Sequence, residues 1–233
     1  MRKIFTKLAF NLLSFFYPKS CVSCNNALQQ NEKQLCLNCM LHLPETNYHL
    51  YIENPLKNIF SGRVRVENVA SLLFYKKENQ VQKILHSLKY KGNKYLGEYL
   101  GIYYGEKLIQ QKEYQNIDLI IPIPLHEKKL KLRGYNQSEW IAKGLSKGMN
   151  LPYNANLLIR TEYTGTQTKK SRFNRWENVR DVFELTDIDL LKDKHILLCD
   201  DVLTTGATTE AAIQKIIEIE NVKVSVVTLA SVY

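Results

Sequence analysis

Two adjacent carboxylates, Asp200 and Asp201, follow the apolar run 195–199 and precede a short segment rich in hydroxyl groups. The apolar run predicts a buried strand that delivers both acids to the edge of a sheet. The hydroxyl segment leads into a predicted helix, and the unpaired N–H groups of a helix N-terminus favour a phosphate. The residues that we expect to bind this phosphate are Thr204, Thr205, Gly206, Ala207 and Thr208.

The two carboxylates suit a different part of the same ligand. They would repel a phosphate, but they can accept hydrogen bonds from the 2- and 3-hydroxyls of a ribose, so a 5-phosphoribosyl group satisfies both demands. A plain strand-to-helix turn is the alternative, and a capping Thr explains neither the paired acids nor the three threonines. A Walker B strand also matches in outline, but the chain has no G-x-x-x-x-G-K-[ST] motif.

Four cysteines have the spacing of a metal site. Two Cys-x-x-Cys pairs are separated by eleven residues, and two such turns can close a tetrahedral cage of four sulfurs around zinc. With all four positions filled, the zinc would be structural. The alternatives are two disulfides, which need an oxidising compartment, or four incidental thiols. The predicted ligands are Cys21, Cys24, Cys36 and Cys39; His42 could replace one of them, and Cys199 is expected to be a buried strand thiol.

Composition excludes several classes of protein. The chain has 233 residues, of which 45% are hydrophobic, and this argues against disorder and low complexity. No apolar stretch approaches the length of a membrane span. The net charge is +9, and residues 126–180 hold twelve Lys or Arg against four Glu. This segment is either a solvated basic face or a surface that meets phosphate, as substrate or nucleic acid.

Strands alternate with helices along most of the chain. We predict strands over 69–75, 118–121, 195–199 and 222–229, and helices over 81–88, 96–103 and 208–219 and after a cap at Asn136. This order indicates an α/β fold with a mainly parallel sheet covered on both faces. Ligands of such sheets bind beyond the carboxyl ends of the strands, which selects the segments 122–133 and 200–208.

The first 50 residues are expected to form a separate unit. Residues 1–17 predict an amphipathic helix docked on its own protein, and a signal peptide or membrane-surface anchor is the alternative. The predicted domains are therefore 1–50, a helix plus the four-cysteine module, and 51–233. The reduced cysteines favour the cytoplasm.

The chain resembles the competence-protein-F (ComF) family. The stretch HILLCDDVLTTGATT matches the phosphoribosyl pyrophosphate (PRPP) motif of type I phosphoribosyltransferases. The cysteine pairs and the segments LKYKGNKYLGEYLG, IPIPLHEKKLKLRGYNQSE and RTEYTGTQTKKSRFNRWENVRDVF extend the likeness over nearly the whole chain. The resemblance implies a type I phosphoribosyltransferase-like sheet flanked by helices, with an N-terminal zinc ribbon.

The resemblance also implies roles for particular residues. Asp200 and Asp201 would hold the ribose, partly through Mg²⁺, and Arg172 would belong to a basic loop over 160–180 that closes on PRPP. The pyrophosphate would be bound by Pro124, Leu125, His126, Lys128 and Arg133.

In biology, the family likeness implies binding of single-stranded DNA during natural transformation, with a DNA-uptake helicase as a candidate partner. Stacking candidates are Tyr135, Trp140, Phe173 and Trp176, although Trp140 also fits a core position. The alternative is an active phosphoribosyltransferase that transfers phosphoribosyl from PRPP to a nucleobase in nucleotide salvage.

Overall fold

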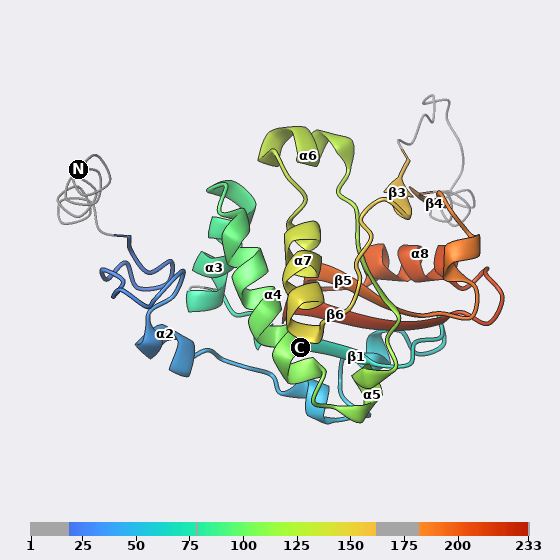
Figure 1. Cartoon of the computed structure of the whole chain (residues 1–233), viewed down its shortest axis with the longest axis horizontal. Coiled ribbons are helices and arrows are strands. Elements are labelled where there is room, and N and C mark those ends of the chain that lie inside the picture. Colours follow the sequence, from blue (N-terminus) through green and yellow to red (C-terminus); the bar gives the residue numbers. More distant parts are fainter. Residues whose placement is uncertain (1–18, 78, 162–181, 233) are drawn as a thin grey trace, which may run out of the picture.

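A four-stranded parallel sheet forms the centre of the molecule (Figure 1). The computed structural model describes residues 19–77, 79–161 and 182–232. The strands run in the order β1 (Val69–Phe74), β6 (Lys223–Ser231), β5 (His195–Leu203) and β2 (Leu119–Pro122), and all three neighbouring pairs are parallel. The predicted α/β fold with a parallel sheet is confirmed.

Helices cover both faces of this sheet. Alternate residues of a strand point to opposite faces, and in β5 Ile196 and Leu198 join one core whereas Leu197 and Cys199 join the other. The first core is covered by α8 (Ala207–Ile216). The second is covered by α3 (Gln80–Tyr90), α4 (Lys94–Leu108) and α7 (Gln137–Met149). Burial on both faces explains why the strands read as continuous apolar runs.

Shorter elements fill the connections. They are α2 (Leu37–Leu41), η1 (Tyr48–Leu50), η2 (Lys57–Ile59), α5 (Lys112–Gln115), α6 (Glu127–Arg133), β3 (Leu158–Arg160), β4 (Phe183–Leu185) and η5 (Asp189–Leu191). β3 and β4 form a separate antiparallel pair. The segment before α2 lies beside α3, on the far side of the molecule from α8 (Figure 1).

Helices α4 and α7 touch backbone to backbone. A Cβ atom built on Gly144 of α7 would lie 2.3 Å from the carbonyl oxygen of Glu98, and one on Gly148 would lie 2.4 Å from that of Ile102. Only glycine permits such an approach, because any side chain would force the two helices apart. The contact fixes the position of α7, whose first turn faces the end of β5.

The structure differs from the predicted elements at one important end. β5 continues to Leu203, so both acids lie in the strand and not in the loop after it. The extension occurs because Asp200 pairs with Thr228 and Val202 with Ala230 of the neighbouring strand. In the described part of the chain, no helix is long and apolar enough to cross a membrane. The helix predicted for residues 1–17 lies outside the described residues.

Candidate functional site

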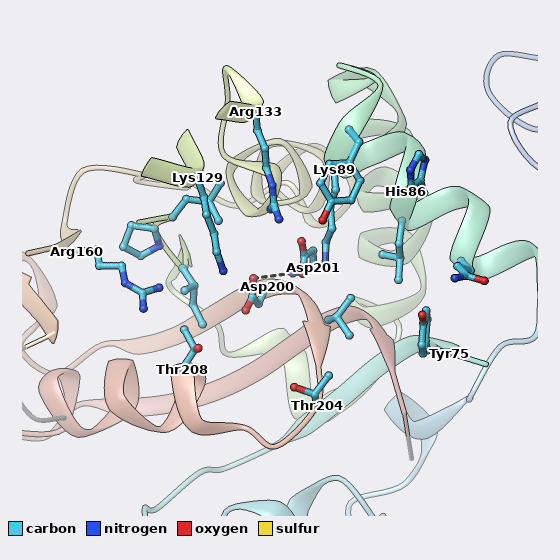
Figure 2. A pocket seen from close by; sticks show the side chains of 17 residues that line it. Tyr75, His86, Lys89, Lys129, Arg133, Arg160, Asp200, Asp201, Thr204 and Thr208 are labelled. Atoms are coloured by element: carbon cyan, nitrogen blue, oxygen red, sulfur yellow. Dashed lines mark hydrogen bonds and ion pairs between the residues drawn. The ribbon is translucent and has the colours of Figure 1, made fainter. Parts of the chain in front are cut away.

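A cavity of about 490 Å³ opens at the carboxyl ends of β2 and β5 (Figure 2). Its wall comes from α3, the segment after β2, α6, the end of β5 and the first turn of α8. The volume falls in the range of small-molecule sites, and the location is where open parallel sheets bind ligands. Both of the segments selected from the sequence contribute to it.

The two carboxylates lie at the centre of the cavity and are held by three elements (Figure 2). The Ser138 hydroxyl at the start of α7 donates to Asp200 Oδ1 at 2.7 Å. The Asp201 backbone N–H donates to the same oxygen at 2.8 Å. Lys89 of α3 places its Nζ 3.1 Å from Asp201 Oδ1. The pair is therefore oriented before any ligand arrives.

Crowding of the two acids changes the protonation of Asp200. Burial and the charge of Asp201 raise the pKa of Asp200 to about 7, although the Ser138 hydroxyl and the charge of Lys89 act in the opposite direction. Close by, burial lowers the pKa of Arg160, against the charge of Asp200. Two adjacent carboxylates in this setting favour a ligand that brings hydroxyl donors or a divalent cation, because carboxylate oxygens are ligands that Mg²⁺ prefers.

The turn between β5 and α8 presents hydroxyls to the same cavity. Gly206 is the N-cap of α8 with φ of 78°, and a Cβ atom there would lie 2.7 Å from Ile59 Cγ2, so the turn requires glycine. Thr204 and Thr208 line the cavity, whereas Thr205, Gly206 and Ala207 do not. The first turn of α8 supplies backbone N–H groups beside the two threonines.

The segment after β2 also faces the cavity, but not with every predicted residue. Pro124, Leu125 and Arg133 line it. His126 and Lys128 do not; His126 is the N-cap of α6, and its Nδ1 accepts from the Lys128 N–H at 3.2 Å.

The cation that α6 adds to the cavity is Lys129. Lys129 and Arg133 are four residues apart and share one face of the helix, whereas Lys128 lies on another. Arg133 donates from Nη1 to Gln137 Oε1 at 2.7 Å, and its guanidinium lies 5.5 Å from the centre of the Tyr90 ring. Its buried Nε has no hydrogen-bond partner among the described residues.

The four predicted cysteines come together. Their sulfur atoms all lie within 4.8 Å of one another, and none of the four is in a disulfide. The Cys24 and Cys36 sulfurs are 3.7 Å apart, close to the edge of about 3.8 Å expected for four sulfurs at about 2.3 Å from zinc. The Cys36 N–H donates to Cys21 Sγ at 3.3 Å. His42 is exposed, and its Nδ1 lies 2.8 Å from the Asn38 carbonyl oxygen instead.

This module is attached to α3 and the start of α4. Lys83 donates to the Ser23 carbonyl at 3.1 Å, and the Ser23 hydroxyl donates to Gln80 Oε1 at 3.2 Å. Asn93 donates to Gln34 Oε1 at 2.8 Å. The side chains of Cys21, Leu35, Cys39 and Leu43 are buried in the same core as α3 and α4.

Comparisons with known proteins agree with this geometry. Residues 138–233 match the family model described as the phosphoribosyl transferase domain. Competence protein F of Haemophilus influenzae is 34% identical over 92 residues, 39% of this chain and 40% of that protein's length. DNA utilization protein YhgH of Shigella flexneri is 26% identical over 192 residues, 81% of this chain and 79% of that protein. The chain belongs to the ComF family.

Solved structures resemble this ComF-family chain only distantly. Adenine phosphoribosyltransferase from Leishmania tarentolae is 14% identical, with a TM-score of 0.38, over 81% of this chain and 94% of that one. At this distance the likeness supports no conclusion about the ligand.

Tertiary contacts bring residues to the ComF cavity that sequence reasoning did not assign to the site. Lys89, Lys129, Arg133 and Arg160 surround the carboxylate pair with positive charge, and only Arg133 was predicted as a ligand-binding residue (Figure 2). The helical spacing of Lys129 and Arg133 is a signal that could have found the second lysine. Arg172 lies outside the described residues.

The predicted stacking aromatics have different surroundings. The Tyr135 hydroxyl donates to the Leu88 carbonyl, and its ring packs against the core. Trp140 is half-buried and makes an edge-on contact with Tyr95, with ring centres 5.4 Å apart. Lys94 and Lys143 lie 4.7 and 4.5 Å from the Trp140 ring centre. Phe173 and Trp176 lie outside the described residues.

The raised pKa of Asp200 predicts a pH dependence of stability. Its folded-state pKa of about 7 lies above the ordinary value of 3.8, so the folded protein binds this proton more tightly than the unfolded chain does. The free energy of unfolding should therefore be greatest below pH 4 and fall as the pH rises to 7. Asp200→Asn should remove this fall and gain about 2–4 kcal/mol on the wild type between pH 4 and pH 8.

Urea unfolding at several pH values, without ligand, measures the effect. Asp187→Asn is the control, because Asp187 is an exposed acid outside the cavity, and this variant should keep the wild-type fall. Parallel stability curves for the wild type and Asp200→Asn would contradict the assignment.

Proposed function

We propose that this ComF-family protein binds PRPP or a related phosphoribosyl ligand together with Mg²⁺, binds single-stranded DNA, and acts in DNA uptake in the cytoplasm. One observation carries the proposal: a carboxylate pair, two threonine hydroxyls and four cations line a single cavity at the end of β5. Hydroxyl acceptors and phosphate donors are thus within reach of one ligand. The match to the phosphoribosyl transferase domain supports a phosphoribosyl group.

In the proposed complex each part of the cavity holds a different part of PRPP. The carboxylates of Asp200 and Asp201 accept from the ribose hydroxyls, directly or through Mg²⁺, which would offset their mutual repulsion. The turn 204–208 binds the 5-phosphate through its threonines and the N–H groups of α8. The segment 123–126, with Arg133 and Lys129, binds the pyrophosphate, and Lys128 lies close enough in sequence to add charge. Closure of the basic loop containing Arg172 would exclude water.

The four-cysteine cluster is proposed to bind one structural zinc ion. The donor set is four thiolates, and the sulfur spacing suits a tetrahedral site with no open position. Residues 1–50 are proposed as the unit that this zinc organises, and 51–233 as the phosphoribosyl domain. The zinc would supply folding energy, because so short a segment buries little core of its own.

Single-stranded DNA is the proposed macromolecular partner. The charge excess of residues 126–180 supplies a phosphate-binding surface, and Trp140 with Tyr95 supplies rings beside two lysines. The names of the relatives, a competence protein and a DNA utilization protein, support a role in DNA uptake. A DNA-uptake helicase remains the candidate protein partner.

Removal of zinc should destabilise the protein. Elemental analysis of the purified chain should find one zinc per molecule, and a strong chelator should lower the melting temperature by several degrees. Cys24→Ser should lose the zinc, whereas Cys199→Ala should keep it, because Cys199 lies in β5 away from the cluster. A chain that purifies without metal and melts unchanged in chelator would contradict the site.

Binding of PRPP should depend on the carboxylate pair. Calorimetry with PRPP and Mg²⁺ should detect one site in the wild type, and Asp201→Ala should weaken it at least about tenfold, or about 1.4 kcal/mol. Asp187→Ala is the matched control, because it removes the same charge from a position outside the cavity. Equal weakening by both variants would show a general charge effect, and no binding by the wild type would reject the function.

Binding of single-stranded DNA should be salt-dependent and involve the cations beside Trp140. In fluorescence anisotropy, affinity should fall steeply as salt rises. Lys94→Ala and Lys143→Ala should each weaken binding and reduce the salt slope by about 1. Lys192→Ala is the control, because Lys192 is exposed and pairs with Asp189 at 2.8 Å elsewhere on the surface. A preference for duplex, or affinity that is insensitive to salt, counts against the DNA proposal.

A further inference from the structure

Helix α3 presents three separate stripes of residues to three different surroundings. Val81, Ile84 and Leu88 are buried in the core over the sheet. Gln80 and Lys83 make hydrogen bonds to the four-cysteine module. The third stripe lines the cavity and consists of Gln82, Leu85, His86, Lys89 and Tyr90. With two faces fixed by packing, the third is a firm wall and not a loose surface.

This wall has a different chemistry from the rest of the cavity. Its side chains are an amide, an aliphatic group, an imidazole and a phenol, and the ring centres of His86 and Tyr90 are 5.1 Å apart. Tyr75, which follows β1, adds a second phenol (Figure 2). The wall carries a single cation, Lys89, and that cation already pairs with Asp201. Such a surface suits a planar polar ring better than a further phosphate.

The wall also lies at the right distance from the proposed ribose position. Lys89 reaches Asp201 at 3.1 Å, and His86 precedes Lys89 by almost one helical turn, or about 5 Å along the axis. Gln82 lies about one turn further on. A ring attached to a ribose on the carboxylate pair would therefore lie beside His86, with Gln82 at its outer edge.

The arrangement around the carboxylates separates two sides of the cavity. In Figure 2, Lys129 and Arg160 lie on one side of Asp200 and Asp201, and His86 and Tyr75 lie on the other. The cationic side suits the pyrophosphate of PRPP. The opposite side is open to a group joined to the same ribose carbon from the other direction.

We infer that the α3 wall, comprising Gln82, Leu85, His86 and Tyr90 with Tyr75, is a subsite for a nucleobase, and that the cavity accepts a nucleoside 5′-monophosphate as one ligand. This inference rests on the proposed phosphoribosyl site, which would hold the sugar and the phosphate. The rings would stack on the base and the Gln82 amide would meet its polar edge.

Calorimetry on the full chain with two kinds of probe tests the subsite. Ribose 5-phosphate reports on the sugar and phosphate positions alone, and the four common nucleoside 5′-monophosphates add a base. The wild type should bind at least one monophosphate about tenfold more tightly than ribose 5-phosphate. His86→Ala and Tyr90→Ala should abolish this difference and leave the affinity for ribose 5-phosphate within about twofold. Tyr51→Ala, which removes an exposed phenol outside the cavity, should change neither.

The possible outcomes separate the two proposals. If ribose 5-phosphate binds but no monophosphate binds more tightly, the base subsite is wrong and the phosphoribosyl site stands. The same conclusion follows if His86→Ala and Tyr90→Ala keep the full advantage of the monophosphate. If no probe binds to the wild type, both the phosphoribosyl site and the base subsite are rejected. Thermal melting checks that each variant is folded, and both α3 positions are exposed, so their substitution leaves the core intact.

Discussion

Repulsion between two adjacent carboxylates at the end of β5 is the constraint around which the site is built. The hydrogen bonds and the ion pair that hold Asp200 and Asp201 come from α7, from the strand's own backbone and from α3. These contacts reduce the cost of the pair but leave the pKa of Asp200 raised to about 7. A ligand that donates hydroxyls, or a divalent cation, removes the remaining cost and so gains affinity from the strain of the free site.

The parts of this site that could be predicted from sequence are those fixed by local chemistry. Apolar runs predicted the strands, and Cys-x-x-Cys spacing predicted the cluster, because both patterns act over a few residues. The contribution of Lys89 could not be predicted in this way, because it depends on how α3 packs across the sheet. The same holds for the end of β5, which is set by pairing of Asp200 with Thr228 of a strand far along the chain.

His126 illustrates the limit of reasoning from residue type. A histidine in a proposed pyrophosphate loop suggests a ligand contact, but its ring accepts from a backbone N–H and begins α6. That cap fixes where the helix starts and thereby which of its residues share the face of Arg133. The residue selected in this way is Lys129, so the helical period of 3.6 decides which lysine faces the cavity.

The four-cysteine module and the cavity do not touch, yet both depend on α3. The module holds one stripe of the helix through Gln80 and Lys83, and the cavity uses another stripe through Lys89. A segment this short gains much of its order from the metal that it binds, so metal binding also restrains α3. By thermodynamic linkage, whatever free energy that restraint adds to ligand binding, the ligand returns to metal binding. The zinc module is therefore best understood as part of the wall of the site and not as an appendage to it.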